Sequence, residues 1–140
     1  MKISIVTPVF NEPRIRQTLD SIVEQEEVPK IETIVVDGGS TDETPEILDE
    51  YRDQIDTLIQ EPDDGIYDAM NKGIECATGD IVGILNADDR YNSTGVLRTV
   101  LDTFEQRDIQ LCYGDLVYVD QNDEVVRYWN SGEYSPRRFY

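Results

Sequence analysis

The chain has 140 residues, with 30 acidic and 12 basic side chains, a formal net charge of −18 at pH 7 and no histidine. This charge excludes nucleic acid as an expected partner, because a strongly acidic surface repels phosphate groups at ordinary salt. The lack of histidine excludes Ser-His-Asp and Cys-His catalysis. It also removes most sites for soft metal ions, so any bound metal should be a hard ion held by oxygen atoms.

Hydrophobic periodicity predicts strands that alternate with helices along the chain. In chain order, the first predicted elements are a strand over 2–7, a helix over 13–26, a strand over Ile31–Asp37, a helix with Thr44 as its cap and Pro45 first, and a strand over Thr57–Gln60. The later ones are a helix over Ile66–Ala77, a strand over Asp80–Asn86, a helix from a Ser93 cap to about Arg107, and strands over 110–119 and 124–129 joined by a turn at 121–123.

This order predicts an α/β fold with a mostly parallel central sheet, helices on both faces and a C-terminal β-hairpin. The helix over Ile66–Ala77 has the clearest pattern. Its predicted apolar face consists of Ile66, Ala69, Met70, Gly73, Ile74 and Ala77. Gly73 should permit close packing against a strand, and Gly79 should close the helix.

Polar segments follow three of the predicted strands, at Thr7–Glu12, Asp37–Asp42 and Asn86–Asp89. The carboxyl ends of parallel strands meet at one edge of a sheet, so these segments should line one cleft rich in carboxylates. Neighbouring carboxylates repel each other unless a cation lies between them. One of Asp88 and Asp89 can therefore face a metal whose other ligands are diphosphate oxygens and water.

Two of these segments, and the acids around the start of the predicted helix over Ile66–Ala77, also have a structural reading. Asp88 and Asp89 can simply begin an exposed turn before Arg90. Asp37 with Gly38 and Gly39 suits recognition of a base or ribose, or equally a tight turn with Ser40 and Glu43 as a capping box. Asp63, Asp64 and Asp68 can be explained by the helix dipole alone. The glycines lack the GxGxxG spacing of a dinucleotide site, which disfavours a Rossmann dehydrogenase.

Four motifs occur in a fixed order: Thr-Pro-Val-Phe-Asn, Val-Asp-Gly-Gly-Ser-Thr-Asp, Gly-Ile-Tyr-Asp-Ala-Met-Asn-Lys-Gly and Leu-Asn-Ala-Asp-Asp. Together they resemble the family 2 glycosyltransferases of bacterial and archaeal polysaccharide and cell-surface glycan assembly, over residues 2 to about 119. The resemblance implies a GT-A fold, a Rossmann-like sandwich. It also implies inverting transfer of a sugar from a nucleoside diphosphate sugar, with a UDP-sugar favoured, to a hydroxyl of a glycan or lipid-linked acceptor with Mn²⁺ or Mg²⁺.

The same resemblance implies roles for single residues. Asp37 would accept a hydrogen bond from the base, and Asp63 or Asp64 would lie beside the base or ribose. Asp88 would face the ribose and Asp89 would bind the metal. Further residues implied at the nucleotide pocket are Thr7, Pro8, Phe10, Asn11, Glu12, Asn71 and Lys72. The first acid of a DxD motif is replaced here by Asn86, which leaves the outer metal ligand open.

An inverting enzyme needs a general base, which the resemblance places in a later acidic motif. The late acids of interest are Asp115, Asp120 and Glu133, and Asp115 is expected nearer the sugar or acceptor cleft. We therefore expect residues 1–140 to form a single nucleotide-sugar-binding domain, the N-terminal part of a longer glycosyltransferase domain. It should bind nucleotide and metal but transfer sugar poorly. The alternative is a non-catalytic or truncated binding module without the base.

The sequence also predicts where the protein is located in the cell and whether its cysteines are reduced. There is no apolar run of about 20 residues and no signal peptide, so a cytoplasmic location is expected, either free or peripherally associated with the inner face of the membrane. Cys76 and Cys112 should be reduced core residues. The acidic residues are spread along the whole chain, which suggests a halophilic cytoplasm of very high salt; an ordinary acidic protein is the alternative.

Overall fold

The computed structural model describes residues 1–132. The chain divides into two compact units, Met1–Thr103 and Phe104–Tyr140, and the boundary falls within the last helix. The strands of the first unit are β1 (Ile3–Val9), β2 (Ile31–Asp37), β3 (Thr57–Gln60) and β4 (Ile81–Ile84). The helices are α1 (Ile15–Val23), α2 (Thr44–Glu50), α3 (Ile66–Cys76) and α4 (Val96–Gln106), the last of which continues into the second unit. All the expected elements are present, several with shorter bounds.

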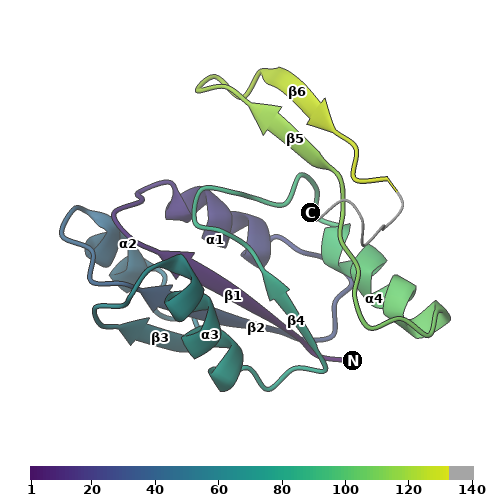
Figure 1. The fold of residues 1–140 in the computed structure, drawn as a ribbon, viewed down its shortest axis with the longest axis horizontal. Coiled ribbons are helices and arrows are strands. Elements are labelled where there is room, and N and C mark those ends of the chain that lie inside the picture. Colours follow the sequence, from purple (N-terminus) through teal and green to yellow (C-terminus); the bar gives the residue numbers. More distant parts are fainter. Residues whose placement is uncertain (133–140) are drawn as a thin grey trace. The chain divides into compact units, whose positions relative to one another are not determined.

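The four strands form one parallel sheet in the order β3-β2-β1-β4. The chain moves in one direction from β1 to β3 and then crosses back to β4, so right-handed connections put α1 and α2 on one face and α3 on the other. Figure 1 shows this arrangement, with α3 in front of the sheet and α1 and α2 behind it. The predicted α/β fold with helices on both faces of a parallel sheet is confirmed.

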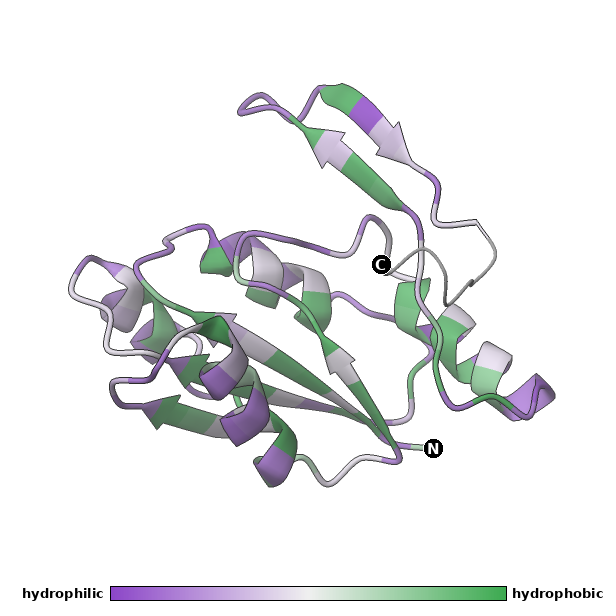
Figure 2. Ribbon diagram, in the orientation of Figure 1, coloured by the Kyte–Doolittle hydropathy of each residue, from purple (hydrophilic) through white to green (hydrophobic). Residues whose placement is uncertain are grey.

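The core lies between the sheet and its helices, and β1 and β2 are buried on both faces. Val6, Ile34 and Val36 pack with Ala69 of α3. Figure 2 shows hydrophobic residues gathered on the strands, with hydrophilic residues on the connecting loops and on parts of the helices. A Cβ at Gly73 would lie 2.3 Å from Val6 Cγ1, so Gly73 is what allows α3 to approach β1 this closely.

Two expectations about α3 are wrong. Its buried residues are Ala69 and Gly73, while Ile66 and Ile74 are 49% and 45% exposed. Small residues face the sheet because the helix lies so close to it, and the larger apolar side chains lie to the sides. Gly79 does not close the helix in a left-handed conformation, because Ala77 is the C-cap. A Cβ on Gly79 would instead lie 2.6 Å from Ser4 Oγ.

The predicted helix caps are also wrong. Thr44 is the first residue of α2 rather than its cap, and Asp42 Oδ1 accepts the hydrogen bond from the Thr44 N–H at 2.9 Å. Ser93 precedes α4 by three residues and uses its carbonyl oxygen to accept from Gln25 Nε2 at 2.7 Å. In both cases the predicted cap is engaged by a residue far away in the sequence, Thr44 Oγ1 by the Glu12 N–H and Ser93 by Gln25, which local spacing does not reveal.

The second unit contains an antiparallel hairpin of β5 (Leu116–Val119) and β6 (Val125–Trp129), as expected. Figure 2 shows β5 and the start of β6 as largely hydrophobic, although all their residues are exposed. Both cysteines are free, as predicted, but Cys76 is exposed and Cys112 is only half-buried, so neither is a core residue. Across residues 1–132, no helix combines the length and apolar character that a membrane span requires.

Candidate functional site

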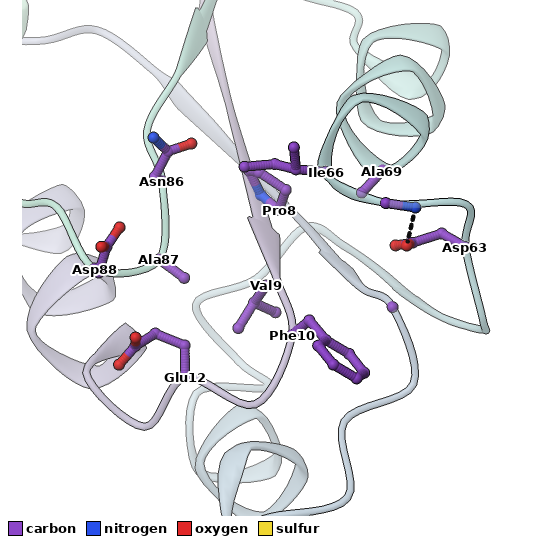
Figure 3. A pocket seen from close by; sticks show the side chains of 12 residues that line it. Pro8, Val9, Phe10, Glu12, Asp63, Ile66, Ala69, Asn86, Ala87 and Asp88 are labelled. Carbon is purple, nitrogen blue, oxygen red and sulfur yellow. Dashed lines mark hydrogen bonds between the residues drawn. The ribbon is translucent and has the colours of Figure 1, made fainter.

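A cavity of about 600 Å³ opens at the carboxyl edge of the sheet. Its lining residues are Pro8, Val9, Phe10, Glu12, Gly38, Asp63, Gly65, Ile66, Ala69, Asn86, Ala87 and Asp88. Figure 3 shows their side chains converging on one space from the ends of β1 and β4 and from the start of α3. The three polar strand ends predicted to share a cleft are therefore brought together.

The register of the sheet explains this convergence. Val9 pairs with Asp37, so β1 and β2 end at the same level. Ile84, the last residue of β4, pairs with Val6, so β4 ends three residues earlier and the chain after it continues as a loop at the same edge. From β1 the chain turns to β2 on one side, while β4 pairs with β1 on the other. The gap beyond β1 and β4 is thus the topological switch point, the usual ligand-binding position in parallel sheets.

The loops after β1 and β2 are tied together by hydrogen bonds. Asn11 adopts a left-handed conformation with φ 48°, and its N–H donates to Ser40 Oγ at 2.8 Å. The Asn11 side-chain oxygen accepts from the Thr41 N–H at 2.7 Å. The Glu12 N–H donates to Thr44 Oγ1 at 3.0 Å. Asn11 therefore shapes the rim between two strands and does not itself line the cavity.

Asp63 comes from the loop before α3 and lines the cavity on the same side as Phe10, across from Glu12 and Asp88 (Figure 3). Its Oδ1 accepts from the Gly65 N–H at 2.9 Å. A Cβ at Gly38 would lie 2.5 Å from Asp63 Oδ2, so Gly38 is the residue that lets the two loops come together. Phe10 is 61% exposed, and its ring lies at the mouth of the cavity.

Asp37 is buried behind this wall and is not among the cavity residues. It is 2% exposed, its Oδ1 accepts from the Ser40 N–H at 2.9 Å, and its Oδ2 lies 3.4 Å from Gln60 Nε2. The Ser40 hydroxyl is used by Asn11, so it does not form the capping box considered for this turn. The predicted contact between Asp37 and a base remains a prediction.

Three other residues implied at the pocket lie outside its lining. Lys72 forms ion pairs with Glu61 at 2.9 Å and Asp68 at 3.2 Å, which hold the loop before α3. The Asp64 N–H donates to Asp68 Oδ2 at 3.2 Å. Asn71 is exposed on α3. The contacts of Asp64, Asn71 and Lys72 with nucleotide remain predictions.

A cluster of charges marks the β1–β4 side of the cavity. Arg14 forms a two-point contact with Glu12, with Nε to Oε1 at 2.8 Å and Nη2 to Oε2 at 2.7 Å. The same Nη2 lies 3.9 Å from Asp88 Oδ2. These hydrogen bonds from Arg14 lower the pKa of Glu12. Arg14 thus partly offsets the repulsion between carboxylates at the rim.

Asp88 and Asp89 follow β4 on a turn closed by the Asp89 N–H and the Asn86 carbonyl oxygen at 3.0 Å. Asp88 lines the cavity, whereas Asp89 lies next to the lining. Partial burial and the charge of Asp88 raise the pKa of Asp89. Such a shift is expected where acids are held together before a cation arrives.

Two buried oxygens near this edge have no hydrogen-bond partner, Asn86 Oδ1 and Thr7 Oγ1. Asn86 lines the cavity, while Thr7 is buried within β1. Within residues 1–132, no group of three or more His, Cys, Asp or Glu side chains could hold a metal by itself. The carboxylate oxygens of Asp88 and Asp89 are nevertheless donors of the type that a hard divalent ion prefers, and the remaining ligands of such an ion would come from a bound phosphate and water.

Several cavity residues were not assigned to the site from the sequence. They are Val9, Gly65, Ile66, Ala69 and Ala87. Ile66 and Ala69 were predicted to face the core because both fall on the apolar face of α3. Their position in the first turn of a helix that starts at the carboxyl edge of the sheet is the signal that would have placed them at the cavity.

The late acids considered as a base are held in the second unit. Asp115 Oδ1 accepts from the Ser131 N–H and hydroxyl, both at 2.8 Å, and these bonds lower the pKa of Asp115. Asp120 Oδ1 accepts from the Asn122 N–H at 2.8 Å in the hairpin turn. Glu133 lies outside the described residues. A carboxylate with a lowered pKa is a weak proton acceptor, and a role for Asp115 as base remains a prediction.

Comparison with known sequences gives a consistent result. The family model for glycosyl transferase family 2 matches residues 4–140. A PGL/p-HBAD biosynthesis glycosyltransferase of Mycobacterium tuberculosis is 36% identical over 124 residues, which cover 85% of this chain and 48% of the relative. The uncharacterized glycosyltransferase EpsJ of Bacillus subtilis is 32% identical over 112 residues, covering 78% of this chain and 32% of EpsJ. The chain therefore spans about half the length, or less, of these curated relatives.

Solved structures share the fold. S. aureus TarS superposes with a TM-score of 0.68 and 27% identity, covering 76% of this chain and 33% of TarS. The mannosyltransferase PcManGT from Pyrobaculum calidifontis, in complex with GDP-Man and Mn²⁺, superposes with a TM-score of 0.67 and 28% identity, covering 85% of this chain and 35% of PcManGT. A further TarS structure contains UDP-GlcNAc and superposes with a TM-score of 0.67.

Proposed function

The chain belongs to glycosyl transferase family 2, and we propose that it binds a nucleoside diphosphate sugar in the cavity at the carboxyl edge of its sheet. The sugar would pass from the diphosphate to a hydroxyl group of an acceptor, a glycan or a lipid-linked glycan of polysaccharide assembly. One observation carries the proposal: the cavity joins Asp63 beside Gly38 with Glu12 and Asp88 at the topological switch point of the sheet. Ligands of parallel α/β sheets bind at such points.

The nucleoside end of the donor is assigned to the side of the cavity that holds Phe10, Gly38 and Asp63. The exposed ring of Phe10 offers a face for stacking on a base, and Asp63 Oδ2 is available to accept a hydrogen bond from a base or ribose. We propose a UDP-sugar as the donor. TarS has been solved with UDP-GlcNAc and PcManGT with GDP-Man, so both bases belong in the test.

The diphosphate is assigned to the opposite side, near Asp88. The charged residues that line the cavity are Glu12, Asp63 and Asp88, and among the described lining residues none is Lys or Arg. An anionic diphosphate would be repelled there unless a cation came with it. We therefore propose that Asp89, with Asp88 beside it, holds Mn²⁺ or Mg²⁺. When bound, such an ion would stabilise the negative charge of the leaving diphosphate.

The chain's own groups have defined tasks in this scheme. Arg14 keeps the Glu12 carboxylate turned toward itself, so this acid is less able to compete for the ion. The wall formed by the loops of β1 and β2 orients the nucleoside. Inverting transfer also needs a base on the face of the sugar opposite the diphosphate, and we assign that role to no residue among 1–132.

Calorimetric titration with UDP and with GDP, each in Mn²⁺ and in EDTA, tests the proposal. We expect UDP to bind with Mn²⁺ and to bind at least tenfold more weakly in EDTA. Asp89→Asn should abolish most of the Mn²⁺-dependent gain, because it removes a ligand charge from the ion. The matched control is Asp53→Asn, an exposed acid before β3 at the other edge of the sheet, which should leave the gain unchanged.

A hydrolysis assay with UDP-GlcNAc and GDP-Man separates binding from turnover. Release of nucleotide from either donor would support an active transferase, and binding without release would support the alternative of a non-catalytic binding module. Failure of both nucleotides to bind in Mn²⁺ would overturn the proposal, and equal binding in EDTA would remove the metal from it.

A further inference from the structure

Thr18 and Ser21 on one side of α1, and Gln25 just past the end of that helix, form a row of three polar residues. Each of them hydrogen-bonds to the backbone of residues 87–97, the segment that leads from β4 into the first turn of α4. Ser21 Oγ accepts from the Tyr91 N–H at 3.2 Å, and Gln25 Oε1 accepts from the Leu97 N–H at 2.9 Å. This row of side chains therefore supplies hydrogen bonds to backbone groups that are not paired within a β-sheet.

Thr18 is the member of this row that reaches the two acids. Its hydroxyl lies 2.9 Å from the Ala87 carbonyl oxygen and 2.6 Å from the Asp89 carbonyl oxygen. Thr18 is fully buried and does not line the cavity, so it lies beneath the turn rather than facing a ligand. The two carbonyl groups that it contacts stand on either side of Asp88.

Fixing these carbonyl groups fixes the directions of the acidic side chains. The dihedral angles of residues 87–89 set where the Cβ atoms of Asp88 and Asp89 point. The bond from the Asp89 N–H to the Asn86 carbonyl closes the same turn. Without the Thr18 hydroxyl, one buried carbonyl would lose its donor and the turn would relax to find another.

We infer that Thr18 is a positioning residue for Asp88 and Asp89. Its hydroxyl holds the turn so that both carboxylates face the ion and diphosphate on the β1–β4 side of the cavity. This inference rests on the proposed function. It adds that the affinity of the site for a cation depends on a buried hydroxyl of α1 that touches neither the ion nor the donor.

Two substitutions at one position test the inference. Thr18→Val keeps the shape of the side chain and removes the hydroxyl, whereas Thr18→Ser keeps the hydroxyl. The measured quantity is the ratio of UDP affinity in Mn²⁺ to UDP affinity in EDTA, by calorimetry. We expect Thr18→Val to reduce this ratio about tenfold, as loss of a group that orients a metal ligand typically does. Thr18→Ser should stay within about twofold of wild type, and UDP affinity in EDTA should be unchanged in both.

A neighbouring variant separates positioning from general stability. Ser21→Ala removes the hydrogen bond to Tyr91, two residues past Asp89, from the same helix. It should lower the Tm while leaving the Mn²⁺-dependent ratio intact. Mn²⁺ titration followed by electron paramagnetic resonance in the presence of UDP gives a second readout of the ion itself. If Thr18→Val does not fold, Thr18→Cys, with a weak donor of similar size, should give an intermediate ratio.

The outcomes distinguish the inference from its premise. The inference is overturned if folded Thr18→Val keeps the wild-type ratio of UDP affinity in Mn²⁺ to that in EDTA, or if Ser21→Ala reduces this ratio as much as Thr18→Val does. In either case, Mn²⁺-dependent binding of UDP by the wild-type protein would still support the proposed function. A wild-type protein with no Mn²⁺-dependent gain overturns the metal proposal first, and the role of Thr18 with it.

Discussion

Glu32 lies at the amino edge of the sheet, opposite the cavity, and is only 8% exposed. Lys2 Nζ donates to its carboxylate at 2.6 Å, the Thr78 N–H donates at 2.8 Å, and the hydroxyls of Ser4 and Thr78 donate as well. Burial opposes ionisation of Glu32, but these hydrogen bonds outweigh burial and lower its pKa to about 2. The residue joins the starts of β1, β2 and β4.

This network predicts a loss of stability in acid. Because the pKa of Glu32 is lower in the folded state than the ordinary value of about 4.3, its contribution is present above that value and is lost as the pH falls toward 2. We expect Glu32→Gln to lower the free energy of unfolding by about 2 kcal/mol near pH 6, as loss of a charged hydrogen-bond partner does. Urea unfolding at a series of pH values measures the difference, which should shrink toward zero near pH 2.

The control is Glu75→Gln, an exposed acid on α3, which should change the free energy of unfolding by less than about 0.5 kcal/mol at every pH. A difference between wild type and Glu32→Gln that stays constant from pH 6 to pH 2 would contradict this account of the network.

Among the elements, α3 has the tightest contact with the sheet. Alanine is favoured over glycine by about 1 kcal/mol inside a helix, so propensity alone predicts that Gly73→Ala stabilises the protein. The Cβ would lie 2.3 Å from Val6 Cγ1, and we expect this clash to prevail and lower the free energy of unfolding by about 1–3 kcal/mol. Thermal and urea unfolding measure the change.

Gly95→Ala is the matched control, because no heavy atom lies within 4 Å of the Cβ it would add. It should be nearly neutral. In a double-mutant cycle, Val6→Ala should relieve part of the cost of Gly73→Ala, since it removes the clashing methyl groups. A stabilising Gly73→Ala would mean that α3 moves away from β1 without penalty.

Elements of this fold could be predicted from the sequence because their signals are local. The continuous apolar stretch of β2 and the apolar residues at helical spacing in α1 are visible in short windows of the sequence. The caps could not be predicted, because the Thr44 hydroxyl is engaged by the Glu12 N–H and Gln25 completes the start of α4, both through contacts between residues far apart in the sequence. The exposure of Ile66 was missed for a similar reason, since its position over the cavity depends on where α3 crosses the sheet.

The candidate site was predictable to the level of segments. Strand ends in a parallel sheet share an edge, so Glu12, Gly38 and Asp88 could be expected near one another. Individual side chains were less predictable. Asp37 turns inward because two donors lie there, the Ser40 N–H in the turn after β2 and Gln60 Nε2 on β3. The sequence pattern does not indicate either contact.

The whole molecule carries a net charge of −18, so its acidic side chains repel one another in the folded state. Salt shortens the range of this repulsion, from a screening length of about 10 Å at 0.1 M to about 3 Å at 1 M. We expect the Tm to rise by roughly 5–10 °C between 0.1 and 2 M KCl, measured by circular dichroism. This behaviour would fit a halophilic origin, which remains a prediction.

A neutral osmolyte at matched osmolality is the control for general solvent effects. If repulsion dominates, most of the rise in Tm should occur below about 1 M KCl, and the osmolyte should reproduce only a small part of it. A Tm that is constant or falls with added KCl would show that the excess acidic charge does not limit stability.

The ties between the loops of β1 and β2 have a consequence for ligand capture. Asn11, Ser40 and Thr41 join the two loops through backbone groups on both sides, and Glu12 is tied to Thr44 as well. These two loops are therefore preorganised, and binding of a ligand does not have to include the entropy cost of ordering them. We therefore expect the side of the cavity formed by these two loops to change little when a ligand binds.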